Sequence, residues 1–375
     1  MSKKIIAIVV GLIILGTLLF IGFNSNALFT LTNNNTIKIG LIAQATGKAV
    51  NIGDDVRQGI YLGLEEMNKD KNIISIIFED DGYDQTKAIL AYRKLVDIDN
   101  VKTIIGAIYS SNTLAICPLA EQDKVIIFSP GSGDPKITNC GDFTFRNHAL
   151  ATQKVEELAN YLVKHYNSIS TIYDKSNETW IFGEFIMNKI FLDSNKLVIS
   201  RNPFNKDDLD FKTIVDKVKE ENIDLIFVAS HMPQSAEIIK ELKIRNIKAK
   251  IVTLDVTAVD SDFQKLLGKL TEGVVFSGTD FERNTNPEFW DKYVAKYKRD
   301  PSMYSAQAYD AIKILGAIIK SKCFDGNSYC IKDELYKINN YTGASGPLTI
   351  NKYGDAQKEI VIKEIRNEKF VKIEN

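Results

Sequence analysis

The amino-acid sequence predicts an α/β protein with two lobes, each built on a doubly wound parallel sheet. Short apolar runs alternate with longer amphipathic runs along most of the chain, which is typical of parallel strands joined by helical crossovers. The alternation starts again near residue 150, so a second sheet with its own core is expected there. With 375 residues, 45% of them hydrophobic, the chain is long enough to bury two cores.

The first half of the chain supplies a regular series of strand and helix signals. Its strands read as continuous apolar runs, as expected for strands buried on both faces. The helix expected at 54–68 carries Gly59 and Gly63, which would let it lie close to a sheet. Strands are expected at 37–43, 73–78, 103–107 and 124–128, with helices at 54–68, 85–97 and 111–122.

The second half repeats the pattern and then departs from it. Helices are expected at 152–165, about 180–192, 210–221 and 235–245, with strands at 170–174, 224–230 and 250–255. The last part holds a strand at 273–278, two helices within 287–320 and a hairpin-like stretch at 359–373. We therefore expect this tail to belong partly to each lobe.

The N-terminus carries an export signal. Two lysines precede an uncharged apolar run from Ile5 to Phe23. This run is nearer to the roughly 20 residues of a membrane span than to the roughly 7–15 of a cleaved signal peptide. We expect a retained anchor, with cleavage as the alternative, and an extracytoplasmic location for everything after the run. Residues 1–27 are thus assigned to a signal peptide or membrane anchor and 28–36 to a linker.

The charge and the cysteine content exclude further classes of function and indicate disulfides. The 47 basic and 48 acidic residues give a net charge of −1 with no basic stripe, which argues against nucleic-acid binding. In an oxidising compartment two local disulfides are the natural pairing, Cys323 with Cys330 and Cys117 with Cys140. Two buried thiols beside one loop bridge are the alternative. No CxxC pair or Cys/His cluster is present, so no metal site is expected.

Motifs for enzymatic chemistry are missing from the sequence. The stretch TGK at 46–48 lacks the glycine and the hydroxyl residue of a phosphate-binding loop, and GSGDPK at 131–136 is not a GxGxxG motif. No GxSxG elbow surrounds a serine. A hydrolase that uses a serine and one of the three histidines is a distant alternative. We expect neither catalysis nor a cofactor.

Small polar residues instead follow several of the expected strands. Ligands of open α/β sheets bind beyond the carboxyl ends of the strands. Hydroxyls and free amides at a helix start suit a carboxylate, and an isolated acid suits an ammonium, so the set predicts a site for a zwitterion. For each residue alone, a helix cap or a turn is the alternative. The residues are Ser110, Ser111, the SPGSGDP stretch at 129–135, His231 and Asp255.

Five stretches of the sequence carry a family resemblance: IKIGLIAQATGKAVNIGDDVRQGIYLGLEEMN, VKTIIGAIYSSNTLAICPLAEQDKVIIFSPGSGDPKIT, GDFTFRN, DFKTIVDKVKEENIDLIFVASHMPQSAEIIKELK and YSAQAYDAIKIL. In these the chain resembles the branched-chain amino-acid binding proteins, the type I periplasmic solute-binding proteins of ABC importers, from residue 37 to about 370. The resemblance implies two lobes joined by three hinge crossovers near residues 150, 280 and 358. It places 37–150 with 281–357 in one lobe, and 151–280 with 358–375 in the other.

The resemblance also implies roles for the polar residues. Ser110, with Ser111 beside it, takes the place of the carboxylate-binding serine, and Asp255 that of the acid which holds the ligand's ammonium. Gly131, Ser132 and Gly133 form the loop that offers a carbonyl and a hydroxyl, although Gly133 itself has no hydroxyl. His231 stands where an aromatic residue of the second lobe closes over the ligand. Further candidates for the wall are Tyr109, Ile52, Glu178 and Trp180.

The expected function is therefore capture and delivery of a solute. The resemblance implies that an extracytoplasmic protein closes its lobes around a small ligand, favoured to be an amino acid, and delivers it to ABC permease subunits. The N-terminal helix would tether it to the membrane. A sensory ectodomain that uses the same clamp is the alternative.

Overall fold

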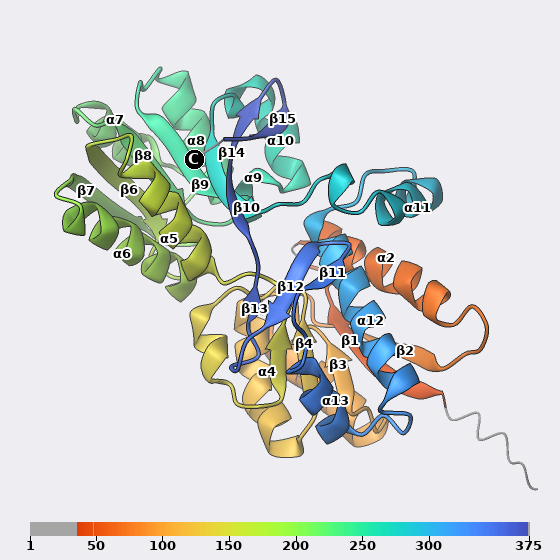
Figure 1. The fold of residues 1–375 in the computed structure, drawn as a ribbon. Helices are drawn as coiled ribbons and strands as arrows, with labels where there is room; N and C mark the ends of the chain where they lie inside the picture. The colour runs from red at the N-terminus through yellow and green to blue at the C-terminus, as the bar shows by residue number, and fades with distance from the viewer. Residues whose placement is uncertain (1–35, 48, 374–375) are drawn as a thin grey trace, which may run out of the picture. The chain divides into compact units, whose positions relative to one another are not determined.

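The computed structural model describes residues 36–47 and 49–373, whose strands form three sheets (Figure 1). The first is a five-stranded parallel sheet of order β2-β1-β3-β4-β5. Its strands are β1 (Ile37–Ala43), β2 (Ile74–Asp80), β3 (Thr103–Ile105), β4 (Ile126–Ser129) and β5 (Thr144–Arg146). A small antiparallel sheet is made by β11 (Tyr341–Gly343), β12 (Gly346–Ile350) and β13 (Ala356–Gln357).

The second large sheet has seven strands in the order β15-β14-β10-β9-β8-β6-β7. Five of them are parallel, and β14 and β15 add an antiparallel hairpin at one edge, where the sequence predicts one. The strands are β6 (Ser168–Asp174), β7 (Leu197–Phe204), β8 (Leu225–Ala229), β9 (Lys250–Leu254), β10 (Val275–Thr279), β14 (Ile360–Arg366) and β15 (Lys369–Lys372).

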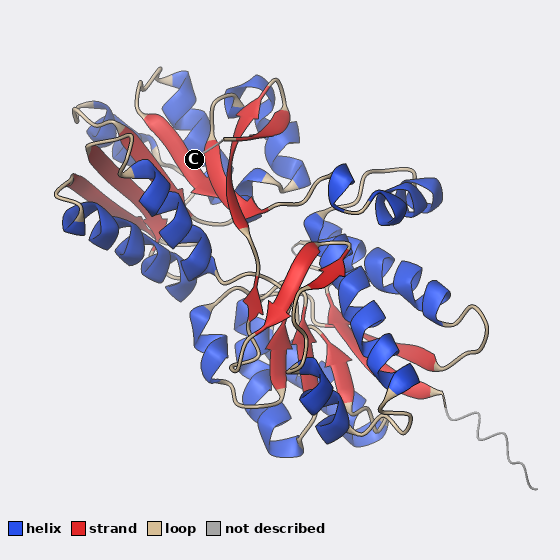
Figure 2. Cartoon of the chain, viewed as in Figure 1, coloured by secondary structure: helices blue, strands red, loops and turns tan. Residues whose placement is uncertain are grey.

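Helices accompany both large sheets (Figure 2). We call the five-stranded sheet, with its helices and the small sheet, the first lobe, and the seven-stranded sheet with its helices the second lobe. The first lobe contains α2 (Val50–Met67), α3 (Gln85–Arg93), η1 (Lys94–Ile98), α4 (Ser110–Asp123), η2 (Pro135–Asn139), η4 (Arg283–Thr285), α11 (Pro287–Tyr297), α12 (Met303–Ser321) and α13 (Ser328–Leu335). The second contains α5 (Ala151–Leu162), α6 (Glu178–Asp193), α7 (Lys212–Lys219), α8 (Gln234–Ile244), α9 (Asp255–Ala258), α10 (Ser261–Leu267) and η3 (Gly268–Thr271).

Each large sheet separates two apolar cores. In β1, Leu41 packs into one core with α2 and α12, while Ile42, the next residue, packs into the other with α3 and α4. In β8, Ile226 and Phe227 likewise enter different cores of the second lobe. Successive side chains of a strand point to opposite faces, so a strand covered on both sides must be apolar throughout. This explains the continuous apolar runs of the sequence.

The chain crosses between the lobes three times. The crossings lie between β5 and α5, between β10 and α11, and between β13 and β14. Ala149 of the first crossing and Ala356 next to the third form an isolated parallel bridge, so these two segments lie side by side. The predicted fold, two doubly wound lobes joined by three crossovers, is confirmed.

One packing prediction is corrected by the structure. Gly59 and Gly63 of α2 let the helix approach α12, not a sheet. A Cβ on Gly59 would lie 2.0 Å from the Ser305 carbonyl oxygen, and one on Gly63 would lie 2.5 Å from an Ile312 methyl carbon. The two helices therefore depend on these glycines for their close contact.

Both predicted disulfides are present, linking Cys117 to Cys140 and Cys323 to Cys330. Among the helices in the described part of the chain, none combines the length and the apolar character that a membrane span requires. The apolar run from Ile5 to Phe23, and with it the predicted signal or anchor at 1–27, lies outside the described residues.

Candidate functional site

A cavity of about 330 Å³ is lined by residues of both lobes. We call it the interlobe cavity. It opens beyond the carboxyl ends of β3, β4, β8 and β9, as expected for a doubly wound sheet. Its lining includes the predicted residues Tyr109, Ser110, Ser111, Gly131, Gly133, Glu178, Trp180 and His231, together with Tyr83, Asp134, Lys136, His148, Lys154, Thr179 and Tyr304.

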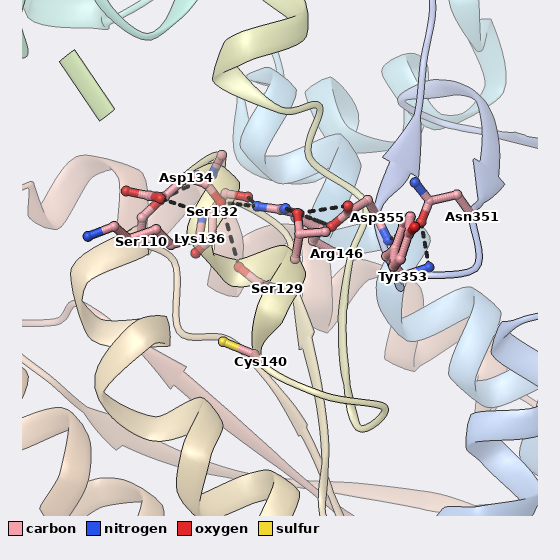
Figure 3. A network of polar contacts seen from close by, with 12 residues as sticks. Ser110, Ser129, Ser132, Asp134, Lys136, Cys140, Arg146, Asn351, Tyr353 and Asp355 are labelled. Atoms are coloured by element: carbon pink, nitrogen blue, oxygen red, sulfur yellow. Dashed lines mark hydrogen bonds and ion pairs between the residues drawn. The ribbon is translucent and has the colours of Figure 1, made fainter. Parts of the chain in front are cut away.

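Ser110 is the first residue of α4, and its side chain meets the loop after β4 (Figure 3). Its hydroxyl oxygen accepts hydrogen bonds from the backbone amides of Gly133 and Asp134, both at 3.1 Å. A hydroxyl has two acceptor lone pairs and one proton, so Ser110 can still donate that proton. The first amides of α4 have no acceptor within the helix. Ser110 and the start of α4 thus form a donor cluster that suits a carboxylate.

Arg146 lies between the loop after β4 and Asp355 and supports that loop by hydrogen bonds (Figure 3). It is fully buried at the end of β5, where its Nη1 donates to the Asp134 carbonyl at 2.6 Å and its Nε donates to Asp355 Oδ1 at 2.8 Å. Asp355 directly precedes β13 and the third crossing. One guanidinium therefore connects the cavity loop to a hinge segment, a role that sequence reasoning missed although Arg146 lies in the GDFTFRN stretch.

The three predicted loop residues divide into two groups. Gly131 and Gly133 line the cavity, and a Cβ on Gly131 would lie 2.7 Å from Ile108. Ser132 does not line the cavity. Its hydroxyl lies 2.8 Å from Thr113 Oγ1 and donates to the Ile108 carbonyl at 3.2 Å. The expectation that Ser132 faces the ligand is therefore corrected: its hydroxyl is already used to fix the loop.

Aromatic rings also line the interlobe cavity. Trp180 of α6 is fully buried and packs edge-on against His231 at 4.9 Å, while Tyr109 meets His231 at 6.2 Å. Burial lowers the pKa of His231 to about 4, so its ring is neutral at pH 7. The indole Nε1 of Trp180 is buried without a hydrogen-bond partner among the described residues. An acceptor on a ligand could satisfy it.

Two polar contacts join the lobes at the cavity. Thr179 Oγ1 donates to Asp134 Oδ2 at 2.8 Å, and Lys136 forms an ion pair with Glu178. Thr179 and Glu178 begin α6, whereas Asp134 and Lys136 lie in the first lobe. Glu178, predicted as part of the wall, is thus a partner in an interlobe ion pair.

Asp255 is not free in the structure, which departs from the expected arrangement. Lys154 Nζ donates to its two carboxylate oxygens at 2.8 and 2.9 Å, and both side chains are almost fully buried. Lys154 lines the interlobe cavity, whereas Asp255 lines a neighbouring cavity of about 380 Å³. Lys154 was missed from the sequence, although it shares a helix face with the buried Leu158 and Leu162, where a charged residue is unusual.

Ile52 also lies elsewhere than predicted. It belongs to the apolar core of the first lobe and lines the neighbouring cavities of about 380 and 580 Å³ rather than the interlobe cavity.

No group of three or more His, Cys, Asp or Glu side chains able to hold a metal occurs within residues 36–47 and 49–373.

The fold and the cavity define a two-lobed solute-binding protein. The family model described as periplasmic binding protein matches residues 36–369, and the chain belongs to this family. The chain is 23% identical over 333 residues to a leucine-, isoleucine-, valine-, threonine- and alanine-binding protein of Pseudomonas aeruginosa, covering 86% of this chain and 87% of that protein.

Solved structures show the same fold. A leucine-binding protein of Thermotoga maritima superposes with a TM-score of 0.82 at 24% identity, covering 90% of this chain and 98% of that one. A solute-binding protein of an ABC transporter from R. palustris, in complex with benzoate, gives a TM-score of 0.80 at 18% identity, covering 90% and 96%.

Proposed function

We propose that this chain is the extracytoplasmic solute-binding protein of an ABC importer and that it captures a small carboxylate ligand, with amino acids as the first class. The P. aeruginosa relative is named for amino acids, and the R. palustris structure holds benzoate. A carboxylate is what these ligands share. Capture and delivery need no bond making or breaking, so we assign no catalytic residue.

The observation that carries this proposal is the donor cluster at Ser110. Its oxygen accepts from two loop amides and leaves its proton for a ligand, beside the amides that begin α4. Aromatic side chains, among them Tyr109, Trp180 and His231, also line the cavity. This combination suits a carboxylate that carries an apolar group.

We assign the lobes as 37–150 with 281–357, and 151–280 with 358–375, closing over the ligand about the three crossings. We further assign the apolar run at 5–23 as the membrane tether and the ABC permease as the recipient of the ligand. Membrane fractionation of cells that express the full-length chain tests the tether, because a protein cleaved after the run would be recovered in the soluble fraction.

Thermal-shift screening of the full-length chain against the common L-amino acids, followed by calorimetry, tests ligand capture. A ligand that binds only the folded protein raises the melting temperature. Ser110→Ala should weaken the best ligand by about 1.5–3 kcal/mol, or roughly ten- to a hundredfold, because a charge-assisted hydrogen bond is lost. Ser110→Thr keeps the hydroxyl and should restore part of the affinity.

Ser321→Ala is the matched control, because Ser321 bonds only within α12 and does not line the interlobe cavity. It should bind as the wild type does. Equal affinity in the wild type and Ser110→Ala would refute the assignment of Ser110 and the carboxylate site.

A further inference from the structure

Lys154 and Asp255 form a closed ion pair next to the interlobe cavity. The ammonium has three protons, and three acceptors lie within hydrogen-bond distance: Asp255 Oδ1 at 2.8 Å, Asp255 Oδ2 at 2.9 Å and His148 Nε2 at 3.0 Å. Asp255 Oδ1 also accepts from the Val256 amide at 2.9 Å. The charge of each side chain is thus balanced within the protein.

His148 fixes the third contact. Its Nδ1 lies 3.1 Å from Gln307 Oε1, which can only accept, so Nδ1 carries the proton and Nε2 accepts from Lys154. Burial and the neighbouring Lys154 ammonium hold the pKa of His148 well below its usual range, in agreement with a neutral ring. Lys154 is therefore held in place from two sides.

The pair does not depend on closure of the lobes. Lys154 lies in the first turns of α5 and Asp255 begins α9, and both helices belong to the second lobe. Gly278 of β10 makes room for the acid, since a Cβ there would lie 2.6 Å from Asp255 Cβ. An open form of the protein would keep the same contact.

A ligand ammonium would find this acid already engaged. It would have to share Asp255 with Lys154, whose positive charge opposes its approach. Gly133 offers no hydroxyl as a further acceptor. The unpartnered buried side-chain atom among the described lining residues, Trp180 Nε1, is a donor and cannot bind an ammonium at all.

We infer that the Lys154 ammonium takes the place of a ligand ammonium, so that the α-amino group adds little to binding and the cavity accepts carboxylates that lack it, such as 2-hydroxy acids. This inference rests on the proposed capture of a carboxylate at Ser110. It widens the ligand class from amino acids to their deaminated counterparts.

Calorimetry on the full-length chain with matched pairs of ligands tests this inference. Each pair consists of an L-amino acid and the 2-hydroxy acid with the same side chain, beginning with L-leucine and 2-hydroxy-4-methylpentanoate. The two dissociation constants of a pair should agree within about threefold in the wild type, whereas a free acid would favour the amine by about ten- to a hundredfold.

Two variants should move this ratio in opposite directions. Lys154→Met frees Asp255 and should shift the preference at least tenfold towards the amino acid. Asp255→Asn leaves the lysine unpaired and should shift it at least tenfold towards the hydroxy acid. A loss of packing alone would weaken both ligands of a pair equally, so the ratio separates recognition from structure.

Lys250→Met is the matched control. Lys250 pairs with Glu364 in the same lobe and lines none of the three cavities described above, so its loss should leave the ratio unchanged. The wild-type ratio decides the inference even where a variant with an unpaired buried charge fails to fold.

A wild-type preference of thirtyfold or more for the amino acid would overturn this inference while leaving the proposed function intact. Failure of both members of every pair to bind would overturn the proposed ligand class, and this inference with it.

Discussion

The residues at and next to the interlobe cavity differ in how many of their hydrogen-bonding groups already have partners within the protein. The Ser110 oxygen is used by two amides, whereas the indole N–H of Trp180 has no partner among the described residues. The Asp255 carboxylate, which lines the neighbouring cavity, is used by Lys154. A residue's type gave its capacity for hydrogen bonding, but only its partners determine what remains for a ligand. The groups that Ser110 and Trp180 leave for a ligand, a hydroxyl proton and an indole N–H, are both donors.

This is also why the sequence could indicate that Ser110 lies at the cavity, whereas it gave no indication of Lys154. Ser110 follows a recognisable strand and begins a helix, so local pattern was sufficient. The partner of Asp255 lies 101 positions away in the chain, and no local signal connects the two. Ser132 shows the same limit, because which of two neighbouring small residues faces a cavity depends on the path of the loop.

The buried His231 should make the folded protein less stable in acid. In the folded protein its pKa is lowered to about 4 by burial, from a value of 6.5 in the unfolded chain. Between these values the unfolded chain binds a proton that the folded protein does not, so stability falls as the pH falls from 6.5 to 4. His231→Phe should reduce this loss, because phenylalanine cannot be protonated.

The measurement is the melting temperature of the wild type and His231→Phe at pH 7.5 and pH 4.5. Some acid sensitivity should persist in the variant, because the pKa of His148 is lowered too. His231→Gln should behave like the phenylalanine variant. An equal drop in melting temperature in all three proteins would argue against a buried neutral ring at 231.

At the scale of the elements, the start of α6 connects the lobes. Asn177 caps this helix by accepting from the Thr179 amide at 2.9 Å, which fixes the first turn. Thr179 and Glu178 then extend to the loop of the first lobe. These contacts can form only when the lobes are closed, so they favour the closed form over an open one.

Thr179→Val should therefore accelerate ligand release. Loss of a hydrogen bond of about 1 kcal/mol would raise the dissociation rate constant by about fivefold, with little change in the association rate constant. Glu178→Gln should have a smaller effect that disappears at high salt, because an exposed ion pair is weak and screened. Stopped-flow displacement of bound ligand measures both; unchanged release in Thr179→Val would contradict a closing role for this contact.

Elements were predicted best where they are buried on both faces. The apolar runs of the sequence directly predicted the inner strands β1, β8 and β9. The edge strand β7 was not predicted, because its apolar run is only three residues long, is followed by Ser200 and Arg201, and has Leu197 and Ile199 exposed. The strand β5 is only three residues long and contains the buried Arg146, so neither its length nor its composition indicates a strand.

At the scale of the whole molecule, both disulfides lie in the first lobe, but they close loops of different size. Cys117 and Cys140 are 23 positions apart, and Cys323 and Cys330 are 7 apart. A cross-link stabilises the folded state mainly by restricting the unfolded chain, more so for a longer loop. The two bridges should therefore contribute unequally.

Replacing Cys117 and Cys140 together by serine should cost about 3 kcal/mol of unfolding free energy, and replacing Cys323 and Cys330 about 2 kcal/mol. Equilibrium urea unfolding of the oxidised full-length proteins measures both values. A larger cost for the shorter loop would show that local packing, rather than chain entropy, determines the contribution of these bridges.

Arg146 and Asp355 have a consequence for how this protein can change over evolutionary time. Their contacts go to loop carbonyls, to Thr138 and to each other, and neither residue lines the interlobe cavity, so they support the cavity loop from outside the cavity. Mutations in facing residues such as Trp180 or His231 can alter the preferred ligand while this support stays intact. We therefore expect binding specificity to change by single substitutions while the supporting contacts of Arg146 stay the same. The same separation would suit the selection of sensors for new ligands on this fold.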